Sequence, residues 1–176
     1  MTDAELARRI REQAYLEGDF VLRSGRRSRY YLDKYRFETE PELLGALAER
    51  IAVRVSREAP KATRLAGPEL GAVALAAATS LASGLPFLIV RKEAKGYGTD
   101  RRLEGAYREG EEVCLIEDVV TSGGAAVAAL EALREGGLEC RLAVCVVDRE
   151  EGGADSLGGH GVQLVSLFRA SEVAEA

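Results

Sequence analysis

The sequence predicts an α/β fold, a single domain with a mostly parallel central sheet flanked by helices. Apolar runs of strand length alternate with helix-patterned segments from residue 64 onward. The runs are continuously apolar, which is typical of parallel strands that are buried on both faces. With 176 residues, 47% of them hydrophobic, the chain can form one compact domain. We expect residues 39–176 to form the core, and residues 1–38 to add a small N-terminal hood, a helix followed by a hairpin.

The hood begins with a helix, because Thr2 and Glu5 form a capping box. One face of this helix is apolar and is marked by Leu6, Ile10 and Ala14. We expect the helix to end near Gly18, and two short strands, 20–23 and 28–33, to form the hairpin. The hairpin carries four arginines, Arg23, Arg26, Arg27 and Arg29. Such charges also occur at solvated sheet edges, where they prevent pairing with other chains.

The core begins with a helix whose predicted capping box is Thr39-Glu40-Pro41-Glu42 and which stops before Pro60. Further helices are expected at about 71–83 and 125–134, the first ended by Gly84 and Pro86. The predicted strands are 64–66, 87–90, 113–116, 141–147 and 162–168. Ligands of such sheets bind beyond the carboxyl ends of the strands. The turn 67–71, the turn after residue 120 and the loop 91–105 all begin there.

Composition and charge exclude several classes of protein. The net charge of −5 argues against a broad nucleic-acid-binding surface. No apolar run approaches the ~18 residues of a membrane span, and the N-terminus lacks the apolar region of a signal peptide. We therefore expect a soluble cytoplasmic protein. Cys114, Cys140 and Cys145 lie in apolar runs without zinc-binding spacing, so we expect buried thiols.

The segment VCLIEDVVTSGGA, residues 113–125, joins a strand, two carboxylates and a glycine-rich turn that opens a helix. Backbone N–H groups and the helix dipole favour an anion at such a turn, and small side chains let a phosphate approach. Glu117 and Asp118 would repel a phosphate, so they must face ribose hydroxyls or a hydrated Mg²⁺. An ordinary turn between strand and helix is the alternative. A site for a phosphate, a diol and a cation suits a ribose phosphate.

The loop that starts at Arg91 is long and polar, and runs to about Gly110. Loops of this length in a compact domain are usually functional or disordered. Lys92 and Lys95 are two of only four lysines in a chain with 20 arginines, so this loop uses a compact ammonium where arginine is the usual cation. A solvated charged loop is one interpretation. The other is a cationic lid that closes over a polyphosphate.

Four segments resemble a known family. E-D-V-V-T-S-G-G, residues 117–124, resembles the phosphoribosyl-pyrophosphate (PRPP) motif of the type I phosphoribosyltransferases. R-K-E-A-K-G-Y-G, residues 91–98, resembles the catalytic loop R-K-E-x-K-x-H-G of the orotate phosphoribosyltransferases. The hairpin F-V-L-R-S-G-R-R-S-R-Y-Y resembles the orotate-binding segment of that subfamily, and D-R-E at 148–150 resembles its D-R-x element. The four matches lie in one order between about residue 20 and residue 150.

The resemblance implies transfer of the 5-phosphoribosyl group from PRPP to orotate, giving orotidine 5′-phosphate and pyrophosphate, in de novo pyrimidine (UMP) biosynthesis. It implies a catalytic role for Lys95 and orotate binding by Thr121 and Arg149, with Arg23, Tyr31 and Leu32 as further candidates. The implied PRPP-binding residues are Arg91, Lys92, Lys95, Tyr97, Glu117, Asp118, Val119, Val120, Thr121, Ser122, Gly123, Gly124 and Ala125. It also implies Mg²⁺ carried mainly by PRPP rather than by a dedicated protein site, and a homodimer whose catalytic loop is shared across the interface.

Three positions depart from the family pattern. Tyr97 stands where many relatives have histidine, and Arg23 replaces a frequent lysine. Glu69 and Leu70 follow Gly67-Pro68, where relatives often place a lysine. Two alternative functions remain: a phosphoribosyltransferase for another nucleobase, and a non-catalytic regulator that senses PRPP. The regulator would be expected to carry a nucleic-acid-binding module or a basic face.

Overall fold

The structure is a computed structural model, and it describes residues 1–21, 25, 27–93 and 102–176. Arg23, Lys95 and Tyr97, which the sequence singled out, lie outside the described residues. In chain order the elements are α1 (Asp3–Ala14), β1 (Tyr15–Val21), β2 (Arg27–Leu32), α2 (Tyr35–Glu38), α3 (Pro41–Glu58), β3 (Arg64–Pro68), α4 (Gly71–Ser83), β4 (Phe87–Val90), β5 (Leu103–Glu104), β6 (Glu112–Val120), α5 (Gly124–Glu135), β7 (Glu139–Asp148), α6 (Gly153–Gly158), β8 (Gln163–Arg169) and α7 (Ala170–Glu175).

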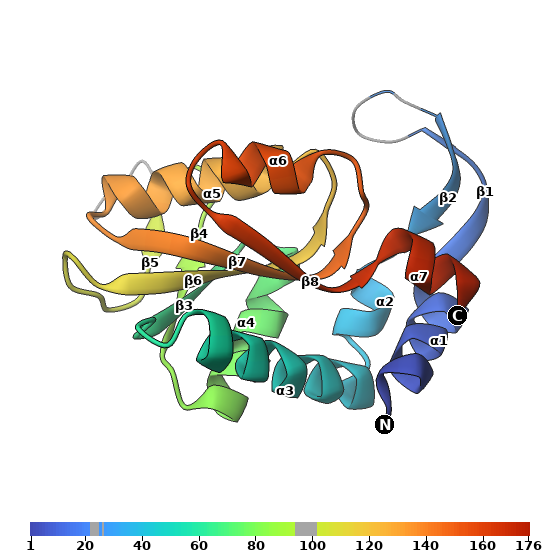
Figure 1. Ribbon diagram of the computed structural model, residues 1–176, viewed down its shortest axis with the longest axis horizontal. Helices are drawn as coiled ribbons and strands as arrows, with labels where there is room; N and C mark the ends of the chain where they lie inside the picture. Colours follow the sequence, from blue (N-terminus) through green and yellow to red (C-terminus); the bar gives the residue numbers. More distant parts are fainter. Residues whose placement is uncertain (22–24, 26, 94–101) are drawn as a thin grey trace.

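The central sheet has six strands in the order β5-β4-β3-β6-β7-β8. All neighbouring strands are parallel except β4 and β5, which are antiparallel, so the predicted mostly parallel sheet is confirmed. The chain winds from β3 to β4 through α4, and in the other direction from β6 to β7 through α5 (Figure 1). The strand order therefore reverses between β3 and β6, which is where open α/β sheets bind ligands.

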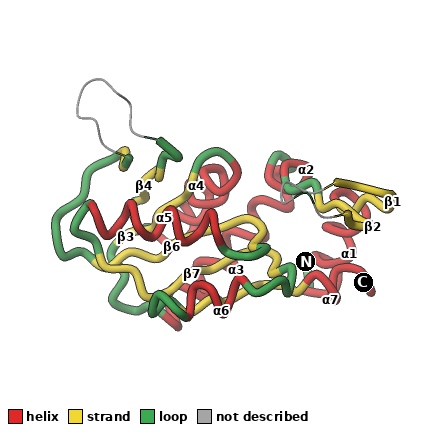
Figure 2. The backbone as a smooth tube through the Cα atoms, turned by 90° about the horizontal axis from the view of Figure 1, so that it is seen from above, coloured by secondary structure: helices red, strands yellow, loops and turns green. Residues whose placement is uncertain are grey.

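Helices cover both faces of the sheet, with α3 and α4 on one side and α5 and α6 on the other (Figures 1 and 2). The side chains of β6 alternate between the two layers. Cys114 and Ile116 pack in the α3–α4 cluster, whereas Val113 and Leu115 pack in the α5 cluster. The apolar residues of α3 that face the sheet are all buried: Leu43, Leu47, Ile51 and Val55. The three cysteines are buried free thiols, as predicted.

The hood lies at one end of the sheet and consists of α1, the β1–β2 hairpin and α2, with α7 packed on α1 (Figure 1). The prediction that the first helix reaches Gly18 is wrong, because α1 ends at Ala14 and β1 begins at the next residue. Tyr15 stacks on Tyr30 of β2, with ring centroids 4.9 Å apart. Pairing with a distant strand thus overrides the local helix signal, as tertiary contacts often do.

Other differences are local. The N-cap of α3 is Glu40, whose carboxylate accepts from the Leu43 backbone N–H at 3.0 Å; the predicted capping residue, Thr39, instead donates its hydroxyl to the Tyr35 carbonyl. β6 extends to Val120, so Glu117 and Asp118 belong to the strand instead of following it. Four short elements, α2, β5, α6 and α7, were not predicted. Such short elements depend on contacts with their neighbours more than on intrinsic propensity.

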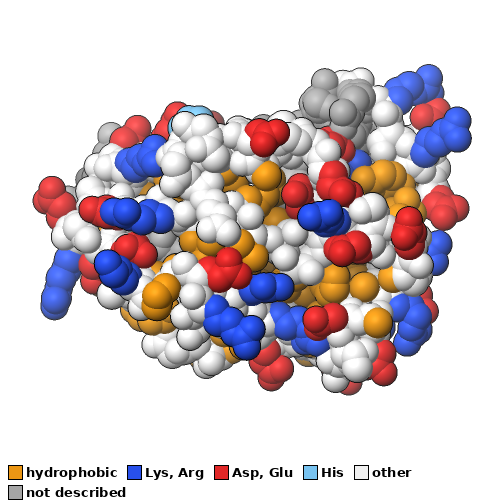
Figure 3. Space-filling model, in the orientation of Figure 1, with side chains coloured by type: hydrophobic (Ala, Val, Ile, Leu, Met, Phe, Trp, Pro, Cys, Tyr) orange, Lys and Arg blue, Asp and Glu red, His pale blue; other side chains and the backbone are white. Residues whose placement is uncertain are grey.

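Acidic and basic side chains are interspersed over the face of the molecule shown in Figure 3. Of the helices in the described ranges, none is both long and apolar enough to cross a membrane.

Candidate active site

Polar groups gather at the carboxyl ends of β3 and β6, at the point where the strand order reverses. β6 contributes Glu117 and Asp118, and the turn after β3 contributes Gly71, the first residue of α4. A Cβ atom on Gly71 would lie 1.8 Å from Asp118 Oδ2. The absence of a side chain at residue 71 therefore lets the Asp118 carboxylate lie against the N-terminus of α4.

The turn between β6 and α5 has the geometry of an anion site. Gly123, the N-cap of α5, has a φ of 85°, a left-handed conformation that favours glycine. Within the described residues no side chain caps this helix, so its first N–H groups remain available. Thr121, Ser122 and Gly124 are exposed around them. The predicted phosphate-binding residues thus lie together at one helix N-terminus.

Helix α6 packs against this turn. A Cβ atom on Gly153 would lie 2.7 Å from the Thr121 carbonyl oxygen, and one on Gly123 would lie 3.2 Å from Gly153 Cα. Two glycines therefore permit the backbones of α6 and the turn to touch. This contact fixes the turn through tertiary packing, which the motif alone does not reveal.

The Asp118 carboxylate is buried and already has partners. Its Oδ2 accepts from the Lys34 ammonium at 2.5 Å, and its Oδ1 accepts from the Val119 backbone N–H at 2.5 Å. Lys34 precedes α2 and so comes from the hood. The hood therefore contributes a charged group to the edge of the core sheet.

Two further carboxyl groups surround this ion pair. Burial, with the nearby charge of Asp118, raises the pKa of Glu117 to about 8. Burial and the same charge raise the pKa of Glu38 to about 9, and Glu38 lies within hydrogen-bonding reach of Asp118. Both groups are therefore neutral at pH 7. A neutral carboxyl group can donate a hydrogen bond as well as accept one.

We expect Glu38→Gln to stabilise the protein at pH 8 and to have little effect at pH 5. Below the ordinary glutamate pKa near 4.5, the group is protonated in both folded and unfolded states. As the pH rises toward about 9, the unfolded state loses this proton while the folded state must retain it, so the wild type loses stability. Glutamine keeps the shape and a donor without this cost. Thermal unfolding of both proteins between pH 5 and pH 8 measures the effect; a difference that grows toward pH 5 would contradict it.

Arg149 lies directly after β7, and its backbone N–H donates to the Val120 carbonyl at 2.8 Å. Its side chain is buried, forms an ion pair with Glu151 at 3.1 Å and stacks on the Tyr30 ring at 4.5 Å from the centroid. Tyr30 is on the hairpin, so this stack joins the hood to the end of β7. A planar guanidinium held in this way can bind carbonyl and carboxylate groups of a flat ligand.

The root of the loop after β4 is tied to the same edge of the sheet. The Lys92 backbone N–H donates to Glu69 Oε1 at 2.6 Å, which connects the loop to the turn after β3. The Arg91 N–H donates to the Arg102 carbonyl at 2.7 Å, and the Arg91 guanidinium lies 3.7 Å from Glu104. Arg91 and Lys92 thus stand at the rim of the site, while Lys95 and Tyr97 lie beyond the described part of the loop.

The sequence did not single out three residues that the structure brings to this edge, namely Lys34, Glu38 and Tyr30. Of the two predicted hairpin residues, Leu32 is buried and Tyr31 is partly exposed and packs near Phe20. Tyr30, the neighbour of Tyr31, is the tyrosine that meets Arg149. The sequence did contain one signal that could have identified Lys34. Lysine is scarce in this chain, and the scarcity that drew attention to Lys92 and Lys95 applies equally to Lys34.

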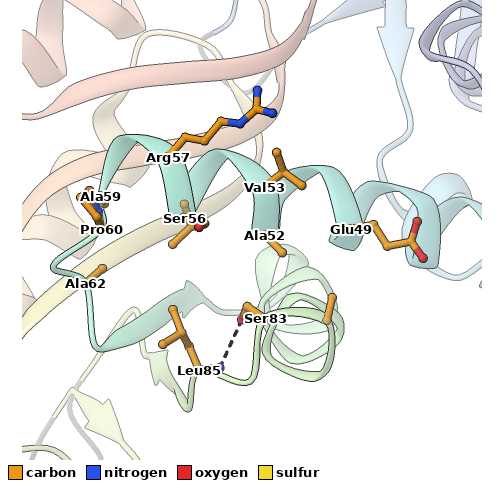
Figure 4. Close-up of a pocket in the computed structure, with 12 residues that line it drawn as sticks. Glu49, Ala52, Val53, Ser56, Arg57, Ala59, Pro60, Ala62, Ser83 and Leu85 are labelled. Atoms are coloured by element: carbon orange, nitrogen blue, oxygen red, sulfur yellow. Dashed lines mark hydrogen bonds between the residues drawn. The ribbon is translucent and has the colours of Figure 1, made fainter.

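A cavity of about 820 Å³ lies elsewhere, between the C-terminal halves of α3 and α4 (Figure 4). Pro60 and Ala62 in its wall lead into β3, and Leu85 leads into β4. The cavity is therefore at the amino ends of these strands, opposite Glu117 and Asp118. Its position does not suit a ligand that is bound by the turn between β6 and α5.

The fold and the site define a phosphoribosyltransferase, and comparison with known proteins agrees. The family model of the phosphoribosyl transferase domain matches residues 39–159. Orotate phosphoribosyltransferase of Methanocella arvoryzae is 48% identical over 173 residues, which cover 97% of each chain.

Solved structures agree with this relationship. The crystal structure of orotate phosphoribosyltransferase from Aeropyrum pernix superposes with a TM-score of 0.84 and 32% identity, covering 99% of this chain and 97% of the other. That of the Mycobacterium tuberculosis enzyme in complex with PRPP has a TM-score of 0.80 and 27% identity, with 98% of each chain covered. The chain belongs to the orotate phosphoribosyltransferase family.

Proposed function

We propose that this protein transfers the 5-phosphoribosyl group of PRPP to orotate, forming orotidine 5′-phosphate and pyrophosphate, a step of pyrimidine biosynthesis. One observation carries the proposal. The N-terminus of α5, which no side chain of the described residues caps, follows the Glu117–Asp118 pair at the point where the strand order reverses. Relatives named orotate phosphoribosyltransferase and a solved relative in complex with PRPP support the same substrates.

Different residues would bind different parts of the two substrates. The turn 121–125 would bind the 5′-phosphate through its backbone N–H groups, and Glu117 and Asp118 would bind the ribose hydroxyls. Arg149 would hold orotate, with Thr121 beside it. Orotate then displaces pyrophosphate from C1 of the ribose. The protein acts mainly by positioning the two substrates and by neutralising charge on the leaving group, for which Arg91, Lys92 and Lys95 are placed in the loop.

Magnesium fits this site as a partner of the substrate. In the described part of the chain, no group of three or more His, Cys, Asp or Glu side chains could hold a metal ion. Mg²⁺ in phosphate sites is commonly held by one or two carboxylates together with phosphate oxygens and water. The ion would therefore arrive with PRPP and be held mainly by phosphate oxygens and water, without a dedicated protein site. There Mg²⁺ would neutralise charge on the diphosphate.

A homodimer is part of the proposal. Helix α4 is rich in alanine and apolar around much of its surface, and Leu81 near its end is 90% exposed. A second copy of the chain could cover this face, since large exposed apolar side chains favour association. We further propose that the protein acts as one catalytic unit, in which the hood, residues 1–38, and the core, residues 39–176, share the site, and that it acts in the cytoplasm.

Substrate choice tests the proposed function directly. The protein should be incubated with Mg²⁺, PRPP and separate nucleobases, and nucleotide and pyrophosphate formation should be measured. We expect orotate to be converted in strong preference to uracil and to purines. Preferred turnover of another base would instead support a different phosphoribosyltransferase, and PRPP binding without turnover of any base would support the regulator.

We expect Arg149→Lys to raise the KM for orotate at least about tenfold, because lysine cannot reproduce the planar, bidentate geometry of arginine. The dissociation constant for PRPP should change little, since the exchange alters only the side chain, which stacks on Tyr30, and keeps the backbone hydrogen bond from Arg149 to Val120 beside the phosphate turn. Steady-state kinetics with each substrate varied separately measure both effects. The control is Arg141→Lys within β7, where the arginine side chain is largely exposed. An equal change in both substrate constants would contradict the assignment.

A further inference from the structure

Lys34 is a charged group of the site that the family motifs did not indicate. Its Nζ lies 2.5 Å from Asp118 Oδ2, and the two side chains are 31% and 4% exposed, respectively. The lysine is thus on the open side of the pair, and a ligand that approaches Asp118 meets the ammonium. Lys34 precedes α2, which packs on both α1 and α4, so its backbone is held by the fold.

The ammonium also touches the start of α4. A Cβ atom on Gly71 would lie 2.6 Å from Lys34 Nζ and 3.0 Å from Lys34 Cε. The N-terminus of a helix carries partial positive charge, so a lysine beside it is electrostatically unfavourable unless an anion lies between. Asp118 is that anion in the free protein. Any ligand that engages Asp118 weakens this compensation and leaves two positive groups side by side.

Neighbouring groups set the charge of the site around Lys34. Burial acts to lower the pKa of Lys34, but the charge and hydrogen bond of Asp118 outweigh it, so the pKa is raised and the ammonium stays charged. The carboxyl groups facing the pair, Glu38 and Glu117, are neutral at pH 7 because their pKa values are raised. Neither Glu69 nor Leu70 in the adjoining turn carries positive charge. Among the described residues of the hood, Lys34 is the cation that contacts Asp118.

We propose that Lys34 is a substrate-binding residue with two successive partners, and this inference rests on the proposed function. In the free protein it holds and neutralises Asp118. A diphosphate bound beside Asp118 draws the ammonium to one of its oxygens, and in PRPP the ribose hydroxyls then take the place of the ammonium on Asp118. Lys34 thereby links binding of the sugar to neutralisation of the leaving group.

Equilibrium binding of three ligands tests the two-partner role: Mg²⁺–PRPP, Mg²⁺–diphosphate and ribose 5-phosphate. For Lys34→Gln we expect affinity for the two diphosphate ligands to fall roughly tenfold or more, the value of a charge-assisted hydrogen bond. Affinity for ribose 5-phosphate should change less than about twofold, since it lacks the diphosphate. Lys34→Arg should recover part of the loss, and Lys61→Gln, an exposed lysine before β3, should match wild type.

Loss of the lysine leaves Asp118 buried without its partner, which can destabilise the variant. A measurement on the wild type avoids this difficulty. Amine labelling followed by mass spectrometry should show that Mg²⁺–diphosphate protects Lys34 but not Lys61.

The outcomes separate this inference from the proposed function. Unchanged diphosphate affinity in folded Lys34→Gln, or equal losses for all three ligands, would overturn the role of Lys34 while wild-type PRPP binding stands. Lys34 labelling unaffected by the diphosphate would do the same. A wild-type protein that binds no PRPP would overturn the proposed function, and the inference with it.

Discussion

Gly124→Asp should abolish PRPP binding while leaving the fold intact or slightly more stable. Gly124 is the first residue of α5, and a Cβ atom there would have nothing within 4 Å. An acidic residue in the first turn of a helix stabilises it by about 0.3–1 kcal/mol. The same charge would face the bound phosphate. Two unit charges 4 Å apart near a protein surface repel by roughly 4 kcal/mol, so we expect at least about a 100-fold loss of affinity.

The opposite signs of the two effects make this variant informative. Thermal unfolding gives the stability, and calorimetric titration of Mg²⁺–PRPP gives the affinity. Gly124→Asn is the control, because it has nearly the same shape without the charge. Near-normal PRPP affinity in the aspartate variant would mean that the segment is an ordinary turn between strand and helix. Gly123→Val is a poorer test, because residue 123 has a φ of 85° and a side chain there would crowd α6, so folding and binding would fail together.

Lys95→Ala should lower kcat by about 10²–10³-fold, with a smaller effect on the dissociation constant of PRPP. Negative charge builds on the pyrophosphate as it leaves, so a cation that closes over it contributes most in the transition state. Single-turnover rates with orotate, together with PRPP titration, separate the two effects. Lys61→Ala serves as the matched control. A change in KM without a change in kcat would restrict Lys95 to substrate binding.

The same variant examines the proposed dimer. If the loop of one subunit completes the site of the other, mixing Lys95→Ala with Asp118→Asn should restore activity, because a hybrid dimer contains one site with both residues intact. Subunit exchange must be shown independently, for example by mass spectrometry of differently labelled chains. Exchange without recovery of activity would place the loop in the site of its own subunit.

Much of the fold could be predicted because it depends on patterns of residues that are close together in the sequence. Continuous apolar strands separated by amphipathic helices define a parallel sheet, and the β4 limits, Phe87–Val90, match the prediction. The candidate phosphate turn was likewise visible in residues 113–125, since its glycines and carboxylates are adjacent in the chain. Patterns of this kind depend on neighbouring residues alone.

What the sequence alone determined is therefore the fold class, the family and the segments that would bind PRPP. Only the tertiary structure decided which distant side chains join those segments. The Lys34–Asp118 pair spans 84 residues, and Arg149 meets Tyr30 across the gap between hood and sheet. The raised pKa values of Glu38 and Glu117 exist only because folding removes both groups from water. Burial and contacts between distant residues are properties of the packed chain, and no local pattern encodes them.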